Sequence, residues 1–460
     1  MTRRTVVICL SLVVLLVGVS AQDRGGAAAG PAAFSMREVA TGLEGPWEVA
    51  WGPDGRLWVT ERTGQRVTRI NPADGTKRVA ITIPEVHSSH SQDGLLGLAL
   101  HPQLLRGTGA DFVYVFFTYD VDPGPDIARR GRIRQYTYEA STETLTNPVN
   151  LLNGLPVHTD HVSGRLIFGP DQKLYLSIGD QGANFGRNYC NSNRAQQVPS
   201  AFEVAARDWI KYEGKLLRVD LDGAIPRDNP VIEGVRSHVY SYGHRNIQGL
   251  TFGPGGRLYA AEHGPSSDDE VNLIRAGGNY GWPNVAGYKD DRGYVYGNWA
   301  AFPACETLPF SSVLTPPAIQ QQKESAFDHP HFVAPLRTFF TVETGYDFQK
   351  QGNATIAPAG LELYSAKSIP GWANSLLLMG MRSGRVYRLK LSANGTTIVG
   401  ASEELFKTTN RYRDSAIAPD GRTIYLATDP EGRTMDGAGV LTRELTNSGS
   451  ILAFTYQDHP

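Results

Sequence analysis

The chain of 460 residues is 41% hydrophobic and 20% charged, which provides enough apolar material for a substantial folded core. Its 44 Lys and Arg residues against 46 Asp and Glu residues leave no basic field, so composition argues against a nucleic-acid partner. Fifty Gly, 28 Pro and 20 Tyr residues indicate many turns and many strands.

The N-terminus has the pattern of a secretory signal peptide at residues 1–21. Arg3 and Arg4 precede an apolar run that ends in small residues. Cleavage leaves residues 22–34 as a flexible leader and predicts a periplasmic or secreted protein. An uncleaved anchor is the alternative. No other stretch is long and apolar enough to cross a bilayer.

A Gly/Asp turn followed by an alternating strand recurs along the chain, which is the pattern of a β-hairpin. Helical periodicity is almost absent outside residues 199–212. Six hairpin units and a closing segment at 448–457 predict an all-β six-bladed β-propeller over residues 35–460, with the last strand completing the blade that the first residues begin. A β-sandwich or two β domains are the alternatives. The six units lie at 52–61, 101–120, 169–180, 253–262, 370–391 and 418–429.

Long inserts separate the third, fourth and fifth units, at roughly 181–250 and 262–368. We expect them on one face of the ring, where a functional site would be built. Asp160 and His161 adjoin just before a repeat strand. Histidine readily takes a proton near neutral pH, and a neighbouring Asp can orient it or hold a substrate, although a structural histidine is the alternative. Gln92 is a candidate hydrogen-bonding partner of a substrate.

Several arginines stand beside the repeat units. Arg245 and Asn246 precede the fourth unit, Arg382 lies within the fifth, and Arg411 and Arg413 precede the last. Each alone reads as a surface charge. Together they suit a multiply charged anionic ligand, because planar guanidinium groups bind carboxylates in a forked geometry.

Residues 262–291 form an acidic loop rich in Gly and Pro. It carries Asp268, Asp269, Glu270 and Asp290, and Ca²⁺ takes six to eight oxygens from carboxylates and loop carbonyls. Aromatic residues beside these charges favour a calcium loop next to a ligand pocket over a solvated acidic loop. A polycarboxylate cofactor held partly by Ca²⁺ and partly by arginine would use both features.

Three cysteines are present, and Cys9 is removed with the signal peptide. An oxidising compartment permits a bridge between Cys190 and Cys305, and two free buried thiols remain equally open.

The segments GHRNIQGL, EHGPSSDDEVNL, GGNYGWPNVAGYKDD, SGRLIFGPDQKLYLSIGDQG and NRYRD together resemble the soluble quinoprotein glucose dehydrogenases, which use pyrroloquinoline quinone (PQQ). The similarity runs from TGLEGPWEVAWGPDGRLWVTER to SGSILAFTYQ, which is nearly the whole mature chain. The resemblance implies a six-bladed propeller, usually dimeric and periplasmic, with PQQ and Ca²⁺ on one face.

The resemblance also implies a role for each matching position. His161 would be the general base on the anomeric hydroxyl of a sugar, and Arg245 would lie near the reacting quinone carbonyl. Gln92 and Asp160 would contact the sugar. The positions that would hold PQQ are Asn246, Thr355, Arg382, Arg411 and Arg413.

Two calcium positions follow from the same resemblance. The backbone carbonyls of Gly264 and Pro265 would hold the Ca²⁺ that also binds PQQ. A second, structural calcium would lie near six residues, several of them through backbone oxygens: Glu270, Tyr280, Ala286, Tyr288, Asp290 and Glu324.

The implied reaction is the oxidation of glucose or a related aldose to the lactone. His161 would take the hydroxyl proton while hydride passes to PQQ, with Ca²⁺ as Lewis acid and Arg245 stabilising the developing charge. Electrons would then go to an external acceptor. Three positions depart from the family in the expected sugar pocket, namely Phe185, Lys350 and Asn353, so the preferred sugar stays open. At the PQQ site, Arg382 stands where the family usually has Lys.

Two other functions compete with this interpretation. A calcium-dependent propeller lactonase would need metal ligands from several blades converging on the central channel. A non-enzymatic secreted binding propeller would leave the pairs Asp160-His161 and Arg245-Asn246 without a purpose.

Overall fold

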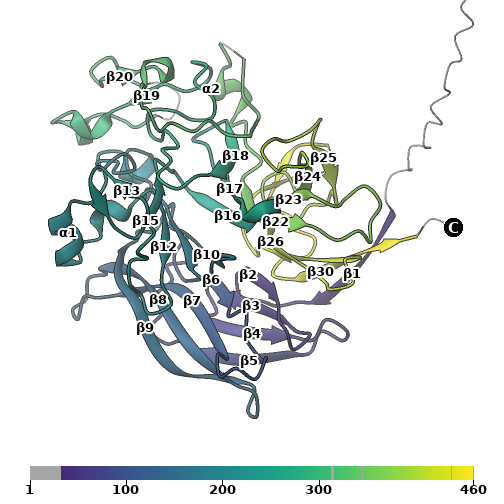
Figure 1. Ribbon diagram of the computed structural model, residues 1–460. Coiled ribbons are helices and arrows are strands. Elements are labelled where there is room, and N and C mark those ends of the chain that lie inside the picture. The colour runs from purple at the N-terminus through teal and green to yellow at the C-terminus, as the bar shows by residue number, and fades with distance from the viewer. Residues whose placement is uncertain (1–32, 312–314, 344, 437, 459–460) are drawn as a thin grey trace, which may run out of the picture. The chain divides into compact units, whose positions relative to one another are not determined.

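The computed structural model describes residues 33–311, 315–343, 345–436 and 438–458 (Figure 1). The expected signal peptide and most of the expected leader lie outside this part of the chain. The leader ends two residues earlier than expected, since Ala33 and Phe34 begin strand β1 (Ala33–Ala40). They pair with Gln457 and Tyr456 at the other end of the chain, which gives them a sheet to join.

The described chain contains six four-stranded antiparallel sheets. The first three blades are β2 (Pro46–Trp51), β3 (Leu57–Glu61), β4 (Arg66–Ile70) and β5 (Lys77–Thr82); then β6 (Leu95–Leu100), β7 (Phe112–Asp120), β8 (Arg129–Glu139) and β9 (Thr144–Pro156); then β10 (Ser163–Phe168), β11 (Leu174–Ile178), β12 (Lys215–Val219) and β15 (Val239–Tyr242).

The other three blades continue in chain order. They are β16 (Ile247–Phe252), β17 (Leu258–Glu262), β18 (Asp269–Ile274) and β21 (Arg337–Phe339); then β22 (Pro358–Tyr364), β23 (Ser375–Gly380), β24 (Arg385–Lys390) and β25 (Glu403–Leu405); then β26 (Tyr412–Ile417), β27 (Thr423–Thr428), β30 (Ile451–Gln457) and β1. Each of the six predicted hairpin units falls on one blade, so the predicted units are confirmed.

The blades close into a ring. The first strand of each blade contacts the first strand of the next, in the order β2, β6, β10, β16, β22 and β26, and β26 returns to β2. Glycines allow this close approach: a Cβ on Gly97 would lie 2.4 Å from the carbonyl oxygen of Gly164, and one on Gly249 would lie 2.4 Å from that of Ala359. The predicted six-bladed β-propeller is confirmed.

The sixth blade joins the two ends of the chain. Strand β1 is its outer strand and pairs antiparallel with β30, in the register Ala33 to Gln457 and Arg37 to Ala453. This is the predicted closure, which leaves the ring without a gap between first and last blade.

Apolar side chains fill the spaces between neighbouring sheets. Trp58 of the first blade and Phe117 of the second are fully buried in one cluster with Tyr136 and Val115. Truncating either large ring to Ala would cost about 3–5 kcal/mol of the free energy of unfolding. Such inter-blade clusters hold the sheets in place and so fix the loops at their ends.

The inserts add short elements only. The expected helix at 199–212 is half as long as predicted: α1 (Ala201–Ala206) begins at a Ser200–Glu203 capping box and ends where Arg207 is left-handed. No helix among the described residues is long and apolar enough to span a bilayer. The other helix of the described chain is α2 (Phe348–Gln351). Three two-stranded pairs are present: β13 (Val231–Ile232) with β14 (Val235–Arg236), β19 (Tyr296–Gly297) with β20 (Gln321–Gln322), and β28 (Thr434–Met435) with β29 (Leu441–Thr442). Short 3₁₀ turns lie at Gly186–Asn188, Ile210–Tyr212, Pro254–Gly256, Trp299–Ala301, Cys305–Thr307 and Glu324–Ala326.

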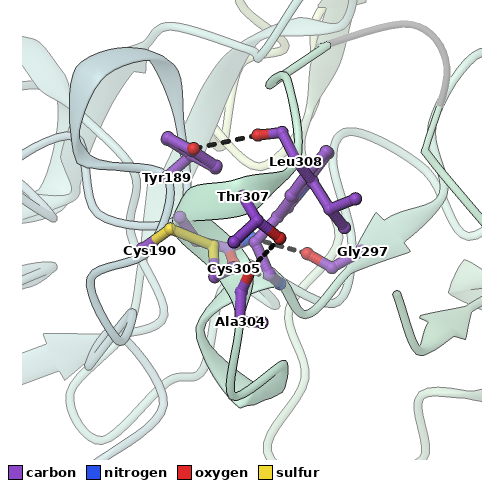
Figure 2. The surroundings of a disulfide bond; sticks show 9 residues. Tyr189, Cys190, Gly297, Ala304, Cys305, Thr307 and Leu308 are labelled. Carbon is purple, nitrogen blue, oxygen red and sulfur yellow. Dashed lines mark hydrogen bonds between the residues drawn. A yellow bond between two sulfur atoms is a disulfide. The ribbon is translucent and has the colours of Figure 1, made fainter. Parts of the chain in front are cut away.

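A disulfide joins two of the inserts. Cys190 follows β11, Cys305 follows β19, and their Cα atoms are 5.8 Å apart (Figure 2). Of the two alternatives left open by the sequence, the structure has the bridge.

Candidate active site

A cavity of about 320 Å³ gathers nine of the predicted site residues. They come from the loops before the first strands of several blades and from second-to-third strand turns, which emerge at the same end of the sheets because the strands alternate in direction. Loops held on a rigid ring in this way are the usual place for a functional site. The nine are Gln92, His161, Arg245, Asn246, Gly264, Pro265, Thr355, Arg382 and Arg411.

A second cavity of about 630 Å³ continues from the first. The two share Gln92, Asn246 and Arg411, and the second is also lined by Arg413. Asp160 lies in neither lining. Its side chain is 43% exposed, and it accepts hydrogen bonds from the Gln92 side chain and from the His161 amide, the latter at 3.0 Å.

His161 is held by a buried carboxylate. Its Nδ1 lies 2.6 Å from Oδ1 of Asp180, which is fully buried at the end of β11. The second oxygen of Asp180 accepts hydrogen bonds from Trp282 Nε1 at 2.7 Å and Asn193 Nδ2 at 2.9 Å. Burial alone would raise the pKa of Asp180, but the neighbouring His161 imidazole and the Arg245 guanidinium hold that pKa below its usual value.

Asp180 was missed in the sequence. The available signal was a carboxylate directly after a repeat strand, in SIGDQG, because that position faces the same end of the blade as His161. An ionised Asp180 can accept a hydrogen bond from Nδ1 of His161, and in that arrangement Nε2 can take a proton from a substrate.

Arg245 is fixed at its backbone and at its guanidinium. The carboxylate of Glu262 accepts hydrogen bonds from the amides of Arg245 and Asn246. The guanidinium stands over the rings of Phe185 and Trp282, with 5.1 and 5.3 Å to the ring centroids. Glu262 was not singled out as a site residue, although it stands at the start of the acidic loop.

The cavity is strongly cationic. Arg245, Arg382 and Arg411 each have a buried Nε with no hydrogen-bond partner among the described residues. Burial lowers the pKa of Arg382 and Arg411, and neighbouring guanidinium groups add to that effect. Arg433, which was not predicted, joins the same lining. A buried donor without a partner is costly, so these groups face a site suited to an anion.

Arg413 has a different setting from the other arginines. It forms an ion pair with Asp429, hydrogen-bonds Gln248 at 3.2 Å and lies over the ring of Trp47, 4.3 Å from its centroid. Its charge is therefore already compensated within the protein.

The Gly264–Pro265 turn and Thr355 are tied to one carboxylate. Asp269 accepts hydrogen bonds from the Gly264 amide at 3.0 Å and from the Thr355 hydroxyl at 2.6 Å. The turn has no room for a side chain, since a Cβ on Gly264 would lie 1.8 Å from the carbonyl oxygen of Ser267. Among the described residues no N–H or O–H donates to the carbonyl oxygens of Gly264 and Pro265.

His263, beside this turn, was not predicted to be a site residue. It lines both cavities, and its Nε2 is buried without a partner in the described part of the chain. Burial and the nearby Arg245 lower the pKa of His263 to about 3, so the imidazole is neutral.

The predicted second calcium region lies outside both cavity linings. Glu270 accepts a hydrogen bond from Gly287 N at 2.6 Å, and Glu324 accepts from Ala286 N at 2.9 Å and Asp291 N at 3.0 Å. Burial raises the pKa of Glu270 well above its usual value. Within the described ranges no three His, Cys, Asp or Glu side chains are gathered closely enough to ligate one ion.

The other residues predicted for that region have varied settings. Tyr280 is buried with its ring stacked 4.5 Å from His244, and its hydroxyl donates to Leu273 O at 2.8 Å. Tyr288 is 38% exposed, and a carboxylate oxygen of Asp290 accepts from Arg292 N at 3.0 Å.

Of the positions that depart from the family pattern, Phe185, Asn353 and Arg382 line the smaller cavity. Lys350 does not. It lies on α2 with an 85% exposed side chain, paired with Asp347 at 3.1 Å.

Comparison with known proteins agrees with the motif resemblance. The family model for glucose/sorbosone dehydrogenases matches residues 43–305 and 346–437. Quinoprotein glucose dehydrogenase B of Acinetobacter calcoaceticus is 41% identical, over 92% of this chain and 91% of that protein. An aldose sugar dehydrogenase of Escherichia coli is 25% identical, over 87% of this chain and 91% of its own. The PQQ-bound aldose sugar dehydrogenase structure from Streptomyces coelicolor has a TM-score of 0.62 and 27% identity, covering 93% of this chain and 100% of the other.

Proposed function

The chain belongs to the glucose/sorbosone dehydrogenase family, and on that premise we propose that it is a quinoprotein oxidoreductase that uses PQQ and Ca²⁺ to oxidise glucose or a related aldose at the anomeric carbon. The observation that carries the proposal is one cavity with three buried, unpaired arginine Nε groups beside the His161–Asp180 pair.

The donor set fits PQQ, which carries three carboxylates on a planar ring system. Arg382 and Arg411 would pair with carboxylates, and Asn246 and Thr355 would add hydrogen bonds from the cavity wall. Arg413 lines the adjoining space with its charge already paired to Asp429, so its contribution would be smaller. When bound, the quinone would accept the hydride that leaves the sugar.

The protein's own contribution is to position and deprotonate the sugar. Nε2 of His161 would take the proton of the anomeric hydroxyl, and Asp180 would stabilise the imidazolium that forms. Arg245 lies in the same lining and would stabilise negative charge that develops opposite the base. Gln92, braced by Asp160, would hold a sugar hydroxyl.

Calcium is proposed on two separate grounds. Gly264 and Pro265 line the cavity, and nothing in the described part of the chain donates to their carbonyl oxygens. Hard cations take such oxygens as ligands. In the second region, burial raises the pKa of Asp268, Glu270 and Glu324, and the charge of Asp268 adds to the rise at the two glutamates. A bound cation would favour the ionised forms of these carboxyl groups.

The lactonase alternative finds less support. Carboxylates from three different blades line a separate cavity of about 530 Å³; they belong to Glu48, Glu362 and Asp414. The guanidinium of Arg165 already stands among them, in ion pairs with Glu48 and, at 2.9 Å, with Asp414. A cation would have to displace it.

Export and dimer formation are also proposed. The Cys190–Cys305 bridge suits an oxidising compartment, in line with the expected signal peptide. Size-exclusion chromatography of the mature chain would show whether it forms the expected homodimer.

The test is reconstitution of the metal-stripped mature chain with PQQ, Ca²⁺ and a panel of aldoses, followed by reduction of a redox dye as the external acceptor. We expect dye reduction that requires cofactor, calcium and sugar together. A variant with Arg382 and Arg411 both changed to Met serves as a control and should bind PQQ poorly. An absence of both PQQ uptake and dye reduction in the wild type would overturn the proposal.

A further inference from the structure

Phe185 lines the smaller cavity. Its ring is nearly parallel to the His161 imidazole, at 6.1 Å and 28°, and the Arg245 guanidinium lies 5.1 Å from its centroid. It therefore touches both side chains to which the proposed function gives catalytic roles. A phenyl ring offers a flat apolar face, on which the C–H face of a sugar ring packs, and no group that hydrogen-bonds a hydroxyl.

A residue of a different insert supports the ring of Phe185. Phe310 packs edge-on against it at 5.3 Å and 74°. Phe310 itself packs on Tyr189 at 5.5 Å and on Trp299 at 5.3 Å. The position of Phe185 thus depends on a segment more than a hundred residues away in the sequence.

Hydrogen bonds tie the two inserts together around this contact. The side chain of Asn184, next to Phe185, donates to Gly297 O at 2.8 Å and accepts from Trp299 N at 2.9 Å. The hydroxyl of Tyr189 donates to Leu308 O at 2.9 Å, beside the disulfide in Figure 2. The sulfur–sulfur bond lies among these contacts, with Cys305 buried against Trp299.

The insert that carries Phe310 has little regular structure of its own. Between β18 and β21 its described residues, 275–311 and 315–336, form only the two-residue strands β19 and β20 and short 3₁₀ turns. A cross-link that closes a loop of 115 residues removes much of the conformational freedom of such a segment.

We propose that the Cys190–Cys305 disulfide positions the sugar-facing wall of the active site: it holds Phe310 in place and, through Phe310, the ring of Phe185 against His161 and Arg245. This inference rests on the proposed function and deepens it. Phe185 sets which sugar face is accepted, and the disulfide is a positioning element that acts through Phe310.

His161 and Arg245 also have anchors outside this wall. His161 is fixed by Asp180, and the backbone of Arg245 by Glu262, through contacts that involve neither cysteine. Opening the bridge should therefore weaken sugar binding more than it slows the chemical step, and it should leave PQQ binding unchanged.

The experiment uses the reconstituted holoenzyme in four forms: wild type, Cys190→Ser with Cys305→Ser, Phe185→Leu, and all three changes together. We expect KM for the preferred aldose to rise roughly two- to tenfold on loss of the bridge, the range of an aromatic contact. We expect kcat to change less than KM. In the Phe185→Leu background the loss of the bridge should have no further effect on KM, because the two changes act through one contact.

Two matched measurements separate positioning from stability. Phe310→Tyr should keep the ring contact and the wild-type KM, whereas Phe310→Ala should match the bridgeless enzyme. All assays run well below the melting temperature of the least stable variant. An unchanged KM in the bridgeless enzyme, or fully independent effects of the bridge and Phe185, would overturn the proposal.

A readout without turnover keeps this result apart from the proposed function. Para-fluorophenylalanine at position 185 gives a ¹⁹F NMR signal in the full chain, recorded before and after dithiothreitol. Cys190 lines a further cavity of about 690 Å³, which a small dithiol can enter. The dithiol gives two electrons and two protons to the bridge and closes into its own cyclic disulfide. We expect the signal to shift or broaden on reduction. An unmoved signal would overturn the positioning role even if the wild type oxidised no sugar.

Discussion

Nδ1 of His161 lies 2.6 Å from the buried carboxylate of Asp180, which two further donors, from Trp282 and Asn193, hold in place. The arrangement fixes both the ring orientation and the tautomer of the imidazole. It also separates the two aspartates near the histidine: Asp180 holds the imidazole, whereas the half-exposed Asp160 braces Gln92.

The first prediction concerns this pair. Asp180→Asn should lower kcat by about 10²–10⁴-fold, the usual contribution of a general base, because an amide no longer fixes the proton on Nδ1. His161→Ala should give a loss of the same order. Both variants should retain PQQ, measured by its absorbance. Glu61→Gln, a change at another buried carboxylate that forms its ion pair with Arg66 in the first blade, serves as the control and should keep most of the turnover. Near-wild-type turnover of Asp180→Asn with saturating PQQ would show that the base lies elsewhere.

The blades were predictable because their signal is local. A turn and an alternating strand occupy about ten residues, and the same pattern returns six times. The end of the leader was not predictable in this way, because Phe34 belongs to a strand only through its pairing with Tyr456. Motif resemblance supplied nine of the residues that line the smaller cavity, but not His263 or Arg433. It did not supply Asp180, whose role depends on Trp282 about a hundred residues later, or the bridge between Cys190 and Cys305, since spacing along the chain carries no distance in space.

The second prediction concerns Arg382, which stands where the family usually has Lys. Arg382→Met should weaken PQQ binding about 10- to 100-fold, the range expected for a lost charge-assisted hydrogen bond. Arg382→Lys keeps the charge and should weaken it less. The apo protein should behave in the opposite way: its melting temperature should rise in Arg382→Met, because a half-buried charge next to Arg433 is removed. PQQ titration and differential scanning calorimetry measure the two effects, and unchanged PQQ affinity would exclude Arg382 from the cofactor site.

The third prediction is a pH dependence of stability set by Glu362. Burial, with the charge of Asp414 adding to it and Arg165 opposing, raises the pKa of Glu362 from 4.5 to about 8. Between these two values the folded state binds a proton that the unfolded state has released. The stability that this proton provides is complete below pH 4.5 and is lost as the pH rises through 8.

Glu362→Gln should remove that part of the dependence. Urea unfolding of the wild type and the variant at several values between pH 5 and 9 measures it. The stability difference between the two proteins should grow in favour of Gln as the pH rises. Glu48 and Asp414 face the same cavity and remain in both proteins, and Asp414 interacts with Glu362, so the difference reports Glu362 together with its effect on Asp414. A pH-independent difference would show that Glu362 is ionised in the folded protein.

The last prediction separates the two proposed calcium positions. The turn at Gly264 and Pro265 belongs to the cavity lining, whereas Glu270 and Glu324 do not. Removing calcium with a chelator should therefore weaken PQQ binding and also lower the melting temperature, since a bound cation stabilises the folded state. Glu324→Gln and Glu270→Gln should abolish most of the thermal response to calcium yet leave calcium-dependent PQQ binding intact, because their carboxylates act only on the second position. Calorimetric titration should show one fewer calcium per chain in these variants than in the wild type. If the variants kept the full thermal response to calcium, the buried carboxylates would not be calcium ligands. If the chelated wild type bound PQQ as tightly as before, the cavity would hold its cofactor without a cation.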